Sequence, residues 1–125
     1  MNKTIASPAA PAAVGPYCQA KLCGNTLYTS GQLGLVPATG KLAEGGVAAQ
    51  AKQSLENLGA VLKEAGMDYA DVVKTTCFLA DMGDFAAFNG VYAKFFTGKP
   101  ARSCVAVREL PKKVLCEIEI IAACK

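Results

Sequence analysis

The repeat of apolar residues between positions 47 and 65 constrains the fold more than any other feature of the sequence. Apolar side chains recur there at steps of three or four residues, at Val47, Ala51, Leu55, Leu58, Leu62 and Ala65. This spacing is typical of one face of an α-helix, and the charged residues Lys52, Glu56 and Lys63 fall between the apolar positions. Gly66 follows directly, and glycine readily takes the left-handed conformation with which many helices end. The pattern predicts an amphipathic helix whose apolar face packs against another layer of the protein.

The segments around this helix predict β-strands, because they are short and contain many β-branched, aromatic or alternating apolar residues. Residues 17–22 and 26–30 flank a turn-forming tripeptide and therefore predict a hairpin. Residues 71–80 are too few for a second long helix, so they predict a strand. Residues 103–107 and 114–123 predict two further strands near the end of the chain.

A second helix is expected to begin after Asp84, whose carboxylate suits an N-cap position. One face of this helix would carry Phe85, Phe88, Val91, Tyr92 and Phe95, which we interpret as core residues. The helix should end before Gly98 and Pro100. The resulting order of elements is ββαβαββ, which is typical of the α+β class.

The last two predicted strands carry the polar residues of greatest interest. In the final strand, alternation places Cys116 and Ile118 toward the helices and Glu117 and Glu119 on the opposite face. Because an unpaired buried carboxylate is costly, the two glutamates must meet solvent, a cation or a subunit boundary. Arg102 and Cys104 share one face of the preceding strand. We expect Arg102 to point into the same region as the glutamates and to form a site there.

Composition excludes several classes of protein. Hydrophobic residues make up 52% of the chain and charged residues 18%, which is incompatible with intrinsic disorder and hints at a surface buried in an oligomer. The net charge of +3 is spread along the chain without a basic cluster, which disfavours nucleic acid as a partner. The first residues lack the apolar core of a signal peptide, and no stretch is apolar enough to cross a membrane. We therefore expect a cytoplasmic protein.

The chemistry available to the chain is limited by the absence of histidine. Ser-His-Asp and Cys-His catalysis are excluded, and a catalytic zinc site is disfavoured. The six cysteines show no Cys-x-x-Cys spacing, which argues against a disulfide framework in a cytoplasmic protein. Any catalysis must use Arg, Glu, Tyr, Ser, Cys or the backbone.

Several separated segments together resemble the RidA (YjgF/YER057c/UK114) family. They are Gly15-Pro16-Tyr17, Tyr28-Thr29-Ser30-Gly31-Gln32, residues 50–57, Val73-Lys74-Thr75-Thr76, Phe88-Asn89 and the stretch from Pro100-Ala101-Arg102-Ser103-Cys104 to Glu119. The resemblance implies one domain over residues 1–125 with a chorismate-mutase-like (YjgF-like) mixed β-sheet and two helices on one face. It also implies a further strand between the last two, and a homotrimer with clefts between subunits.

The resemblance implies hydrolysis of reactive 2-imino or enamine acids, such as 2-iminobutanoate and 2-iminopropanoate, to 2-keto acids and ammonia. This activity protects metabolic enzymes from enamine damage, and it needs no cofactor and no metal. The small-molecule imino and keto acids are then the ligands of the trimer's clefts.

The resemblance also assigns roles to residues. Arg102 matches the arginine that binds the substrate, and a planar guanidinium suits a carboxylate. Glu117 would hold the attacking water, although alternation alone makes Glu119 an equal candidate. Other residues that match the family's cleft are Tyr17, Ser30, Gly31, Asn89 and Cys104.

Each assignment has a plainer interpretation. Arg102 could form an ordinary salt bridge, for example to Glu119, and Glu117 could lie on a solvated strand face. Cys104 could act as a nucleophile beside Arg102, but we favour a small apolar filler whose main chain matters more than its sulfur. Tyr17 and Asn89 could be a packing aromatic and a polar residue on a helix surface.

Two other functions compete with the deaminase. Some relatives are described as ribonucleases or translation inhibitors, but this chain has no histidine for acid–base cleavage and no RNA-binding signature. A stress-responsive chaperone or ligand-binding regulator is compatible with the lysines and thiols, although they do not specifically predict it.

Overall fold

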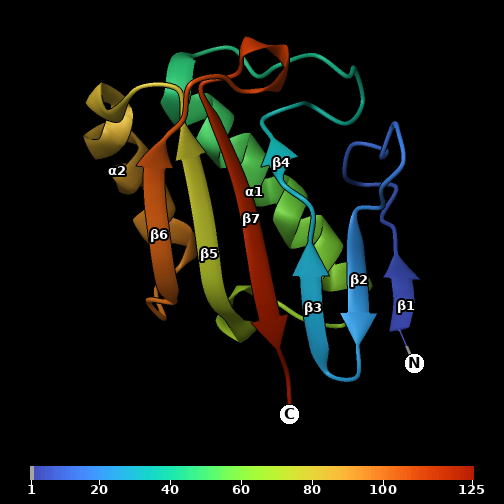
Figure 1. Ribbon diagram of the computed structural model, residues 1–125. Coiled ribbons are helices and arrows are strands. Elements are labelled where there is room, and N and C mark those ends of the chain that lie inside the picture. The colour runs from blue at the N-terminus through green and yellow to red at the C-terminus, as the bar shows by residue number, and fades with distance from the viewer. Residues whose placement is uncertain (1) are drawn as a thin grey trace.

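A computed structural model describes residues 2–125 of the chain. The strands are β1 (Asn2–Ile5), β2 (Ala20–Cys23), β3 (Thr26–Thr29), β4 (Gln32–Leu33), β5 (Val72–Leu79), β6 (Ala101–Ala106) and β7 (Cys116–Ala123) (Figure 1). The helices are α1 (Gly46–Glu64) and α2 (Phe85–Phe95), with short 3-10 turns at Tyr69–Asp71, Met82–Asp84 and Pro111–Lys113. No helix among these residues is both long and apolar enough to span a membrane.

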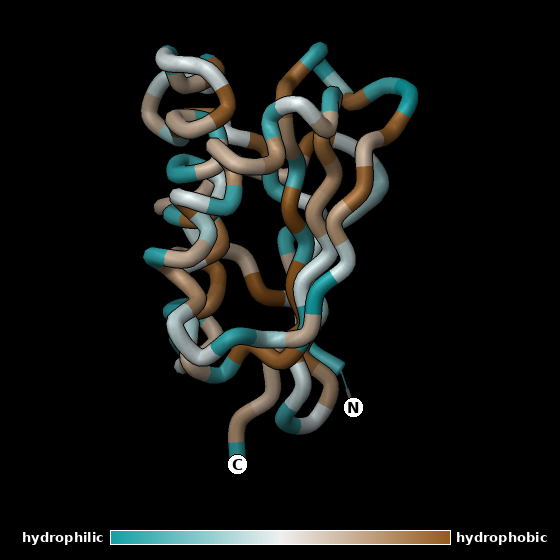
Figure 2. The backbone as a smooth tube through the Cα atoms, turned by 90° about the vertical axis from the view of Figure 1, so that its left-hand side faces the viewer, coloured by the Kyte–Doolittle hydropathy of each residue, from teal (hydrophilic) through white to brown (hydrophobic). Residues whose placement is uncertain are grey.

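The strands form one mixed sheet, and both helices lie on the same face of it (Figures 1 and 2). The strand order is β1-β2-β3-β7-β5-β6, and β4 also pairs with β7. Strands β5 and β6 are parallel, whereas β7 is antiparallel to both β3 and β5. The predicted α+β class, the helices on one face and the strand inserted between the last two are therefore confirmed.

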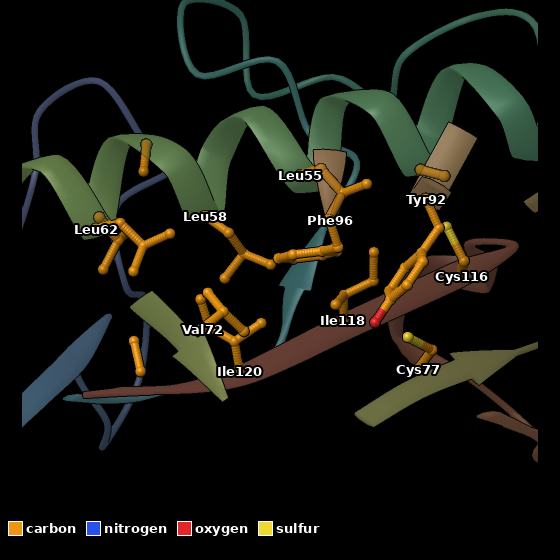
Figure 3. Packing of buried hydrophobic residues seen from close by; sticks show 14 of the residues in the cluster. Leu55, Leu58, Leu62, Val72, Cys77, Tyr92, Phe96, Cys116, Ile118 and Ile120 are labelled. Carbon is orange, nitrogen blue, oxygen red and sulfur yellow. The ribbon is translucent and has the colours of Figure 1, made fainter. Parts of the chain in front are cut away.

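The core lies between α1 and the central strands. Leu55, Leu58 and Leu62 of α1 are fully buried and point toward Ile118 and Ile120 of β7 (Figure 3). Burial of one such side chain contributes about 1.5–3 kcal/mol of hydrophobic stabilisation, so these leucine and isoleucine contacts hold α1 on the sheet. The predicted amphipathic helix is confirmed.

Several details differ from the sequence-based prediction, including the ends of the last two strands. Strands β1 and β4 were not predicted, because β1 is a largely exposed edge strand held by backbone pairing to β2, and β4 is only two residues long. The carboxylate of Asp84 makes no cap hydrogen bond, and Asp81 instead accepts one from the Gly83 amide in the preceding 3-10 turn. The first hairpin strand also begins later than expected, so residues 17–19 belong to a loop.

The opposite face of the sheet carries no helix and exposes apolar side chains. Tyr28 of β3 is 49% exposed and Val105 of β6 is 46% exposed on this face. Phe78 of β5 is in register with Val105 on the same face and is half-buried. This face is turned toward the viewer in Figure 1, with α1 behind the strands.

Candidate active site

Arg102 is held at the edge of the sheet by side chains of α2. It lies on β6, the last strand in the sheet order, and is half-buried. Its Nη1 donates a hydrogen bond to Oδ1 of Asn89 at 2.6 Å. The guanidinium carbon lies 4.7 Å from the ring centroid of Tyr92 and 5.5 Å from that of Phe85. Since one of five N–H donors is used by Asn89, the guanidinium is oriented but retains donors for a carboxylate.

A hydrogen bond to β5 fixes the position of the α2 face that contacts Arg102. The hydroxyl groups of Tyr92 and Thr75 form a hydrogen bond of 2.7 Å, and Thr75 is fully buried. Burial raises the pKa of Tyr92, so the phenol stays neutral at physiological pH. The Tyr92 ring that contacts Arg102 is therefore uncharged, and its hydroxyl group is hydrogen-bonded to the sheet. A cavity of about 340 Å³ adjoins it, with Phe96 and Lys99 in its wall.

Cys104 follows Arg102 by two residues and lies on the same side of β6. It is in register with Cys77 of β5, and both thiols are free. Burial raises the pKa of Cys104, and the lowering effect of Arg102 is the smaller of the two. A thiol with a raised pKa is largely protonated at neutral pH and is a poor nucleophile. This supports the interpretation of Cys104 as a small apolar filler.

Glu117 lies on β7, on the uncovered face of the sheet. It is in register with Leu33 of β4 and with Phe78 of β5. Burial raises the pKa of its carboxyl group, and the negative charge of Glu119 raises it further. A carboxylate whose pKa is moved toward neutrality is a better proton acceptor than an ordinary surface glutamate.

Gly31 leaves room for the Glu117 carboxylate. A Cβ built on residue 31 would collide with Oε2 of Glu117 and would lie 2.7 Å from its Cδ. Real Cβ atoms do not approach other atoms so closely, so any larger residue would move the carboxylate. Gly31 was predicted as a substrate-binding residue, and the geometry gives it a further role in positioning Glu117.

The gap between β3 and β4 is held by hydrogen bonds to the preceding loop. The Ser30 hydroxyl donates to the Cys18 carbonyl at 2.7 Å, and the Ser30 amide donates to the Gln19 carbonyl at 2.9 Å. Tyr17, which is 55% exposed, stands beside this gap. A cavity of about 590 Å³ opens here, lined in part by Tyr17, Ser30, Gly31, Lys112, Glu117 and Glu119.

The predicted site residues therefore form two groups on opposite faces of the sheet. Asn89, Arg102 and Cys104 are on the helix side, and Tyr17, Ser30, Gly31 and Glu117 are on the uncovered side. Thr75 is in register with Arg102 and Phe78 with Glu117, and these two β5 residues are three positions apart, so they face opposite ways. The expectation that Arg102 points into the region of the glutamates is wrong within one chain. Alternation predicts which residues of one strand share a face. It does not predict whether residues of two strands that are not neighbours lie on the same face of the sheet.

Sequence reasoning missed the residues that orient Arg102. Phe85 and Tyr92 were assigned to the core alone, and Thr75 to a strand without a specific contact. A signal was present, because Phe85, Asn89 and Tyr92 recur at steps of four and three residues and so share one helix face. That face was correctly predicted, but its contact with β6 depends on the sheet order.

No group of three or more His, Cys, Asp or Glu residues within positions 2–125 is arranged to hold a metal ion. The two groups of residues described above contain a guanidinium, a carboxylate, a thiol, a phenol, a hydroxyl and an amide.

Comparisons with known proteins extend over the whole site. The family described as Endoribonuclease L-PSP matches residues 7–124. The 2-iminobutanoate/2-iminopropanoate deaminase of Rattus norvegicus is 50% identical over 123 residues, which cover 98% of this chain and 90% of the rat protein. The Escherichia coli K12 protein with the same description is 52% identical over 126 residues and 98% of both chains. The crystal structure of E. coli TdcF with bound serine is 43% identical, has a TM-score of 0.94, and covers 98% of this chain and 99% of that one.

Proposed function

Because this chain belongs to the Endoribonuclease L-PSP (YjgF/RidA) family, we propose that it is a 2-iminobutanoate/2-iminopropanoate deaminase. The reaction is hydrolysis of a 2-imino acid to a 2-keto acid and ammonia, which removes a reactive compound before it damages other enzymes. The observation that carries the proposal is the orientation of Arg102 by Asn89 and Tyr92, with donors left over for a carboxylate.

Arg102 binds the carboxylate of the imino acid. Two parallel N–H groups of a guanidinium match the two oxygens of a carboxylate, which fixes the orientation of the substrate as well as holding it. The aromatic platform beneath the guanidinium limits its motion, so less conformational entropy is lost on binding. A lysine at this position would supply charge without this geometry.

Glu117 activates the water that attacks the imine carbon. Its carboxylate accepts a proton as the oxygen of water bonds to the carbon of the protonated imine, giving a neutral carbinolamine. That proton then passes from Glu117 to the amino nitrogen and the C–N bond breaks. Ammonia leaves, and the hydroxyl proton returns to the Glu117 carboxylate as the carbonyl of the keto acid forms. Orientation of water and substrate supplies the remaining rate enhancement, so this scheme requires no covalent intermediate.

We propose further that two copies of the chain complete each site, in a homotrimer. Arg102 and Glu117 lie on opposite faces of one chain's sheet, so one copy cannot hold both ends of a small substrate. Arg102 is on the edge strand β6, and Glu117 is on the uncovered face, which also carries exposed Tyr28 and Val105. Packing of that face against the β6 edge of a neighbour would bury apolar surface and bring the two groups together.

The proposal includes a single domain over residues 1–125 and a cytoplasmic location. The match of the family to residues 7–124 supports one domain. All six cysteines are free thiols, which is typical of proteins in a reducing compartment. The ligands are small imino and keto acids, and no nucleic acid is required.

The decisive experiment generates 2-iminobutanoate in situ from threonine with a dehydratase and follows release of 2-ketobutanoate. The wild-type protein should accelerate release, and Arg102→Ala should not. Arg108→Ala is the matched control, because Arg108 is the other arginine of the chain and is exposed. Absence of acceleration by the wild-type protein would refute the deaminase, and cleavage of RNA lost in Arg102→Ala would support the ribonuclease alternative.

A further inference from the structure

We propose that an apolar cavity beside Glu117 receives the side chain of the imino acid and limits its size, an inference that rests on the proposed function. The cavity has a volume of about 280 Å³ and lies between the loop that precedes β2 and the segment that contains β4. It is separate from the residues that bind the carboxylate and activate water. We define it as the side-chain cavity, and it would accept branched aliphatic side chains.

The side-chain cavity adjoins the cavity of about 590 Å³ that Glu117 and Glu119 help to line. Both are lined by Val14, Tyr17, Gly31, Leu33 and Lys112. Gly31 lies directly under the Glu117 carboxylate, so a substrate carbon placed for attack by water is next to the entrance. A substituent on that carbon can therefore extend into the side-chain cavity without crossing the protein backbone.

The walls of the side-chain cavity are mostly apolar. Pro11, Ala12 and Ala13 line it from the loop that precedes β2, which we call the first wall, and Gln32, Leu33 and Leu35 line it from the segment that contains β4. Removing apolar groups from water stabilises a bound ligand in proportion to the apolar surface that is buried. An aliphatic substituent therefore gains binding free energy there, and a charged substituent would lose its hydration.

Gln19 also lines the side-chain cavity, but its polar atoms are already used. It is 4% exposed, its Oε1 accepts from the Ser7 amide at 2.6 Å, and its Nε2 donates to the carbonyls of Ser7 at 3.1 Å and Pro11 at 2.8 Å. These bonds fix the loop that forms the first wall. The cavity is thus preformed, and Gln19 makes no demand for a polar group on the substrate.

Lys112 lies at the rim of both cavities and is exposed. Its backbone has a φ of 56°, in the left-handed region that non-glycine residues rarely occupy. The ammonium group can remain in water while the aliphatic stem covers the entrance. Lys112 therefore places no charge inside the side-chain cavity.

The test compares two imino acids generated by an amino acid oxidase, one from alanine and one from leucine. The wild-type protein should accelerate hydrolysis of both. Leu35→Phe, which fills the side-chain cavity, should lower kcat/KM for the leucine-derived substrate at least about tenfold relative to the alanine-derived one. Ala13→Leu, on the opposite wall, should change the ratio in the same direction, and Leu35→Ala should change it in the other.

Ala48→Leu is the matched control, because Ala48 is an exposed residue of α1 and lines neither the side-chain cavity nor the cavity at Glu117. It should leave both rates unchanged. An equal loss with both substrates in Leu35→Phe and Ala13→Leu would overturn the assignment of the cavity, as would a wild-type protein active only on the alanine-derived substrate. Failure of the wild-type protein on both substrates would instead refute the deaminase itself.

Discussion

The Glu117 carboxylate lies directly over Gly31, where a Cβ would collide with Oε2. We predict that Gly31→Ala displaces the carboxylate and lowers kcat by about 10²–10⁴, the usual contribution of a positioned general base. The fold should survive, because the displaced atoms are the flexible end of a side chain. Steady-state kinetics and circular dichroism measure the two effects.

Gly90→Ala is the control for this substitution. Gly90 is exposed on α2 and has no atom within 4 Å of a built Cβ. This change should leave kcat unaltered and stabilise the helix by about 0.5–1 kcal/mol. Full activity in Gly31→Ala would contradict a role for the Glu117 position.

Glu117→Gln should abolish most activity but increase the thermal stability at neutral pH. The folded state raises the pKa of Glu117 above its ordinary value of 4.5, so it favours the protonated form. Ionisation therefore opposes folding as pH rises through the raised pKa, and below the ordinary value both states are protonated and the penalty disappears. Glutamine removes the penalty, and its gain in Tm should vanish at acidic pH.

The wild-type rate should also fall on the acid side, where protonation of Glu117 removes the proton acceptor. Melting curves and kcat profiles across pH check both effects. Glu119→Gln serves as the control, because Glu119 is exposed and its loss removes only the smaller of the two causes of the shift. A Glu117→Gln protein with normal turnover would exclude activation of water by this group.

Arg102→Lys should weaken substrate capture by about 10–100-fold in kcat/KM, the range expected when a charge-assisted hydrogen bond is lost. Lysine retains the positive charge but cannot present two parallel donors to a carboxylate. The loss should appear mainly in KM. Arg108→Lys, at an exposed position, should match the wild type, and a normal KM in Arg102→Lys would refute bidentate binding.

Cys104→Ala should retain activity, with a loss smaller than the about 100-fold typical of a missing acid or base. The raised pKa of Cys104 keeps its thiol protonated. Iodoacetamide should accordingly modify exposed Cys23 faster than Cys104, which mass spectrometry can follow. A completely inactive Cys104→Ala protein with normal assembly would assign the sulfur a chemical role.

Mixing inactive Arg102→Ala and Glu117→Gln proteins under conditions of subunit exchange should restore about a quarter of the wild-type activity if each site uses Arg102 of one copy and Glu117 of the next. In an equal random mixture, half of the copies retain Arg102 and the other half retain Glu117, so a quarter of the interfaces combine an intact Arg102 with an intact Glu117. Each variant refolded alone is the control. No recovery, with mixed oligomers demonstrated by native mass spectrometry, would place both groups in one subunit.

Much of the fold follows from local patterns. The period of α1 and the alternation of β7 depend only on which side chains must leave water, so Leu55 and Ile118 could be assigned to the core from the sequence. The edge strand β1 carries no such pattern, because its residues 2–4 are exposed and it is held by backbone hydrogen bonds to β2. The sequence pattern of side chains therefore does not predict an edge strand of this kind.

The sequence by itself determined the candidate residues for chemistry: a single arginine in Pro-Ala-Arg-Ser-Cys and two glutamates in an otherwise apolar strand, in a chain without histidine. Only the tertiary structure decided which of these residues face each other. Insertion of β5 between β6 and β7 turns Arg102 toward α2 and leaves Glu117 on the uncovered face. The physical reason is that side-chain alternation is a local property of each strand, whereas the relation between two strands depends on the hydrogen-bonded register of the strand between them.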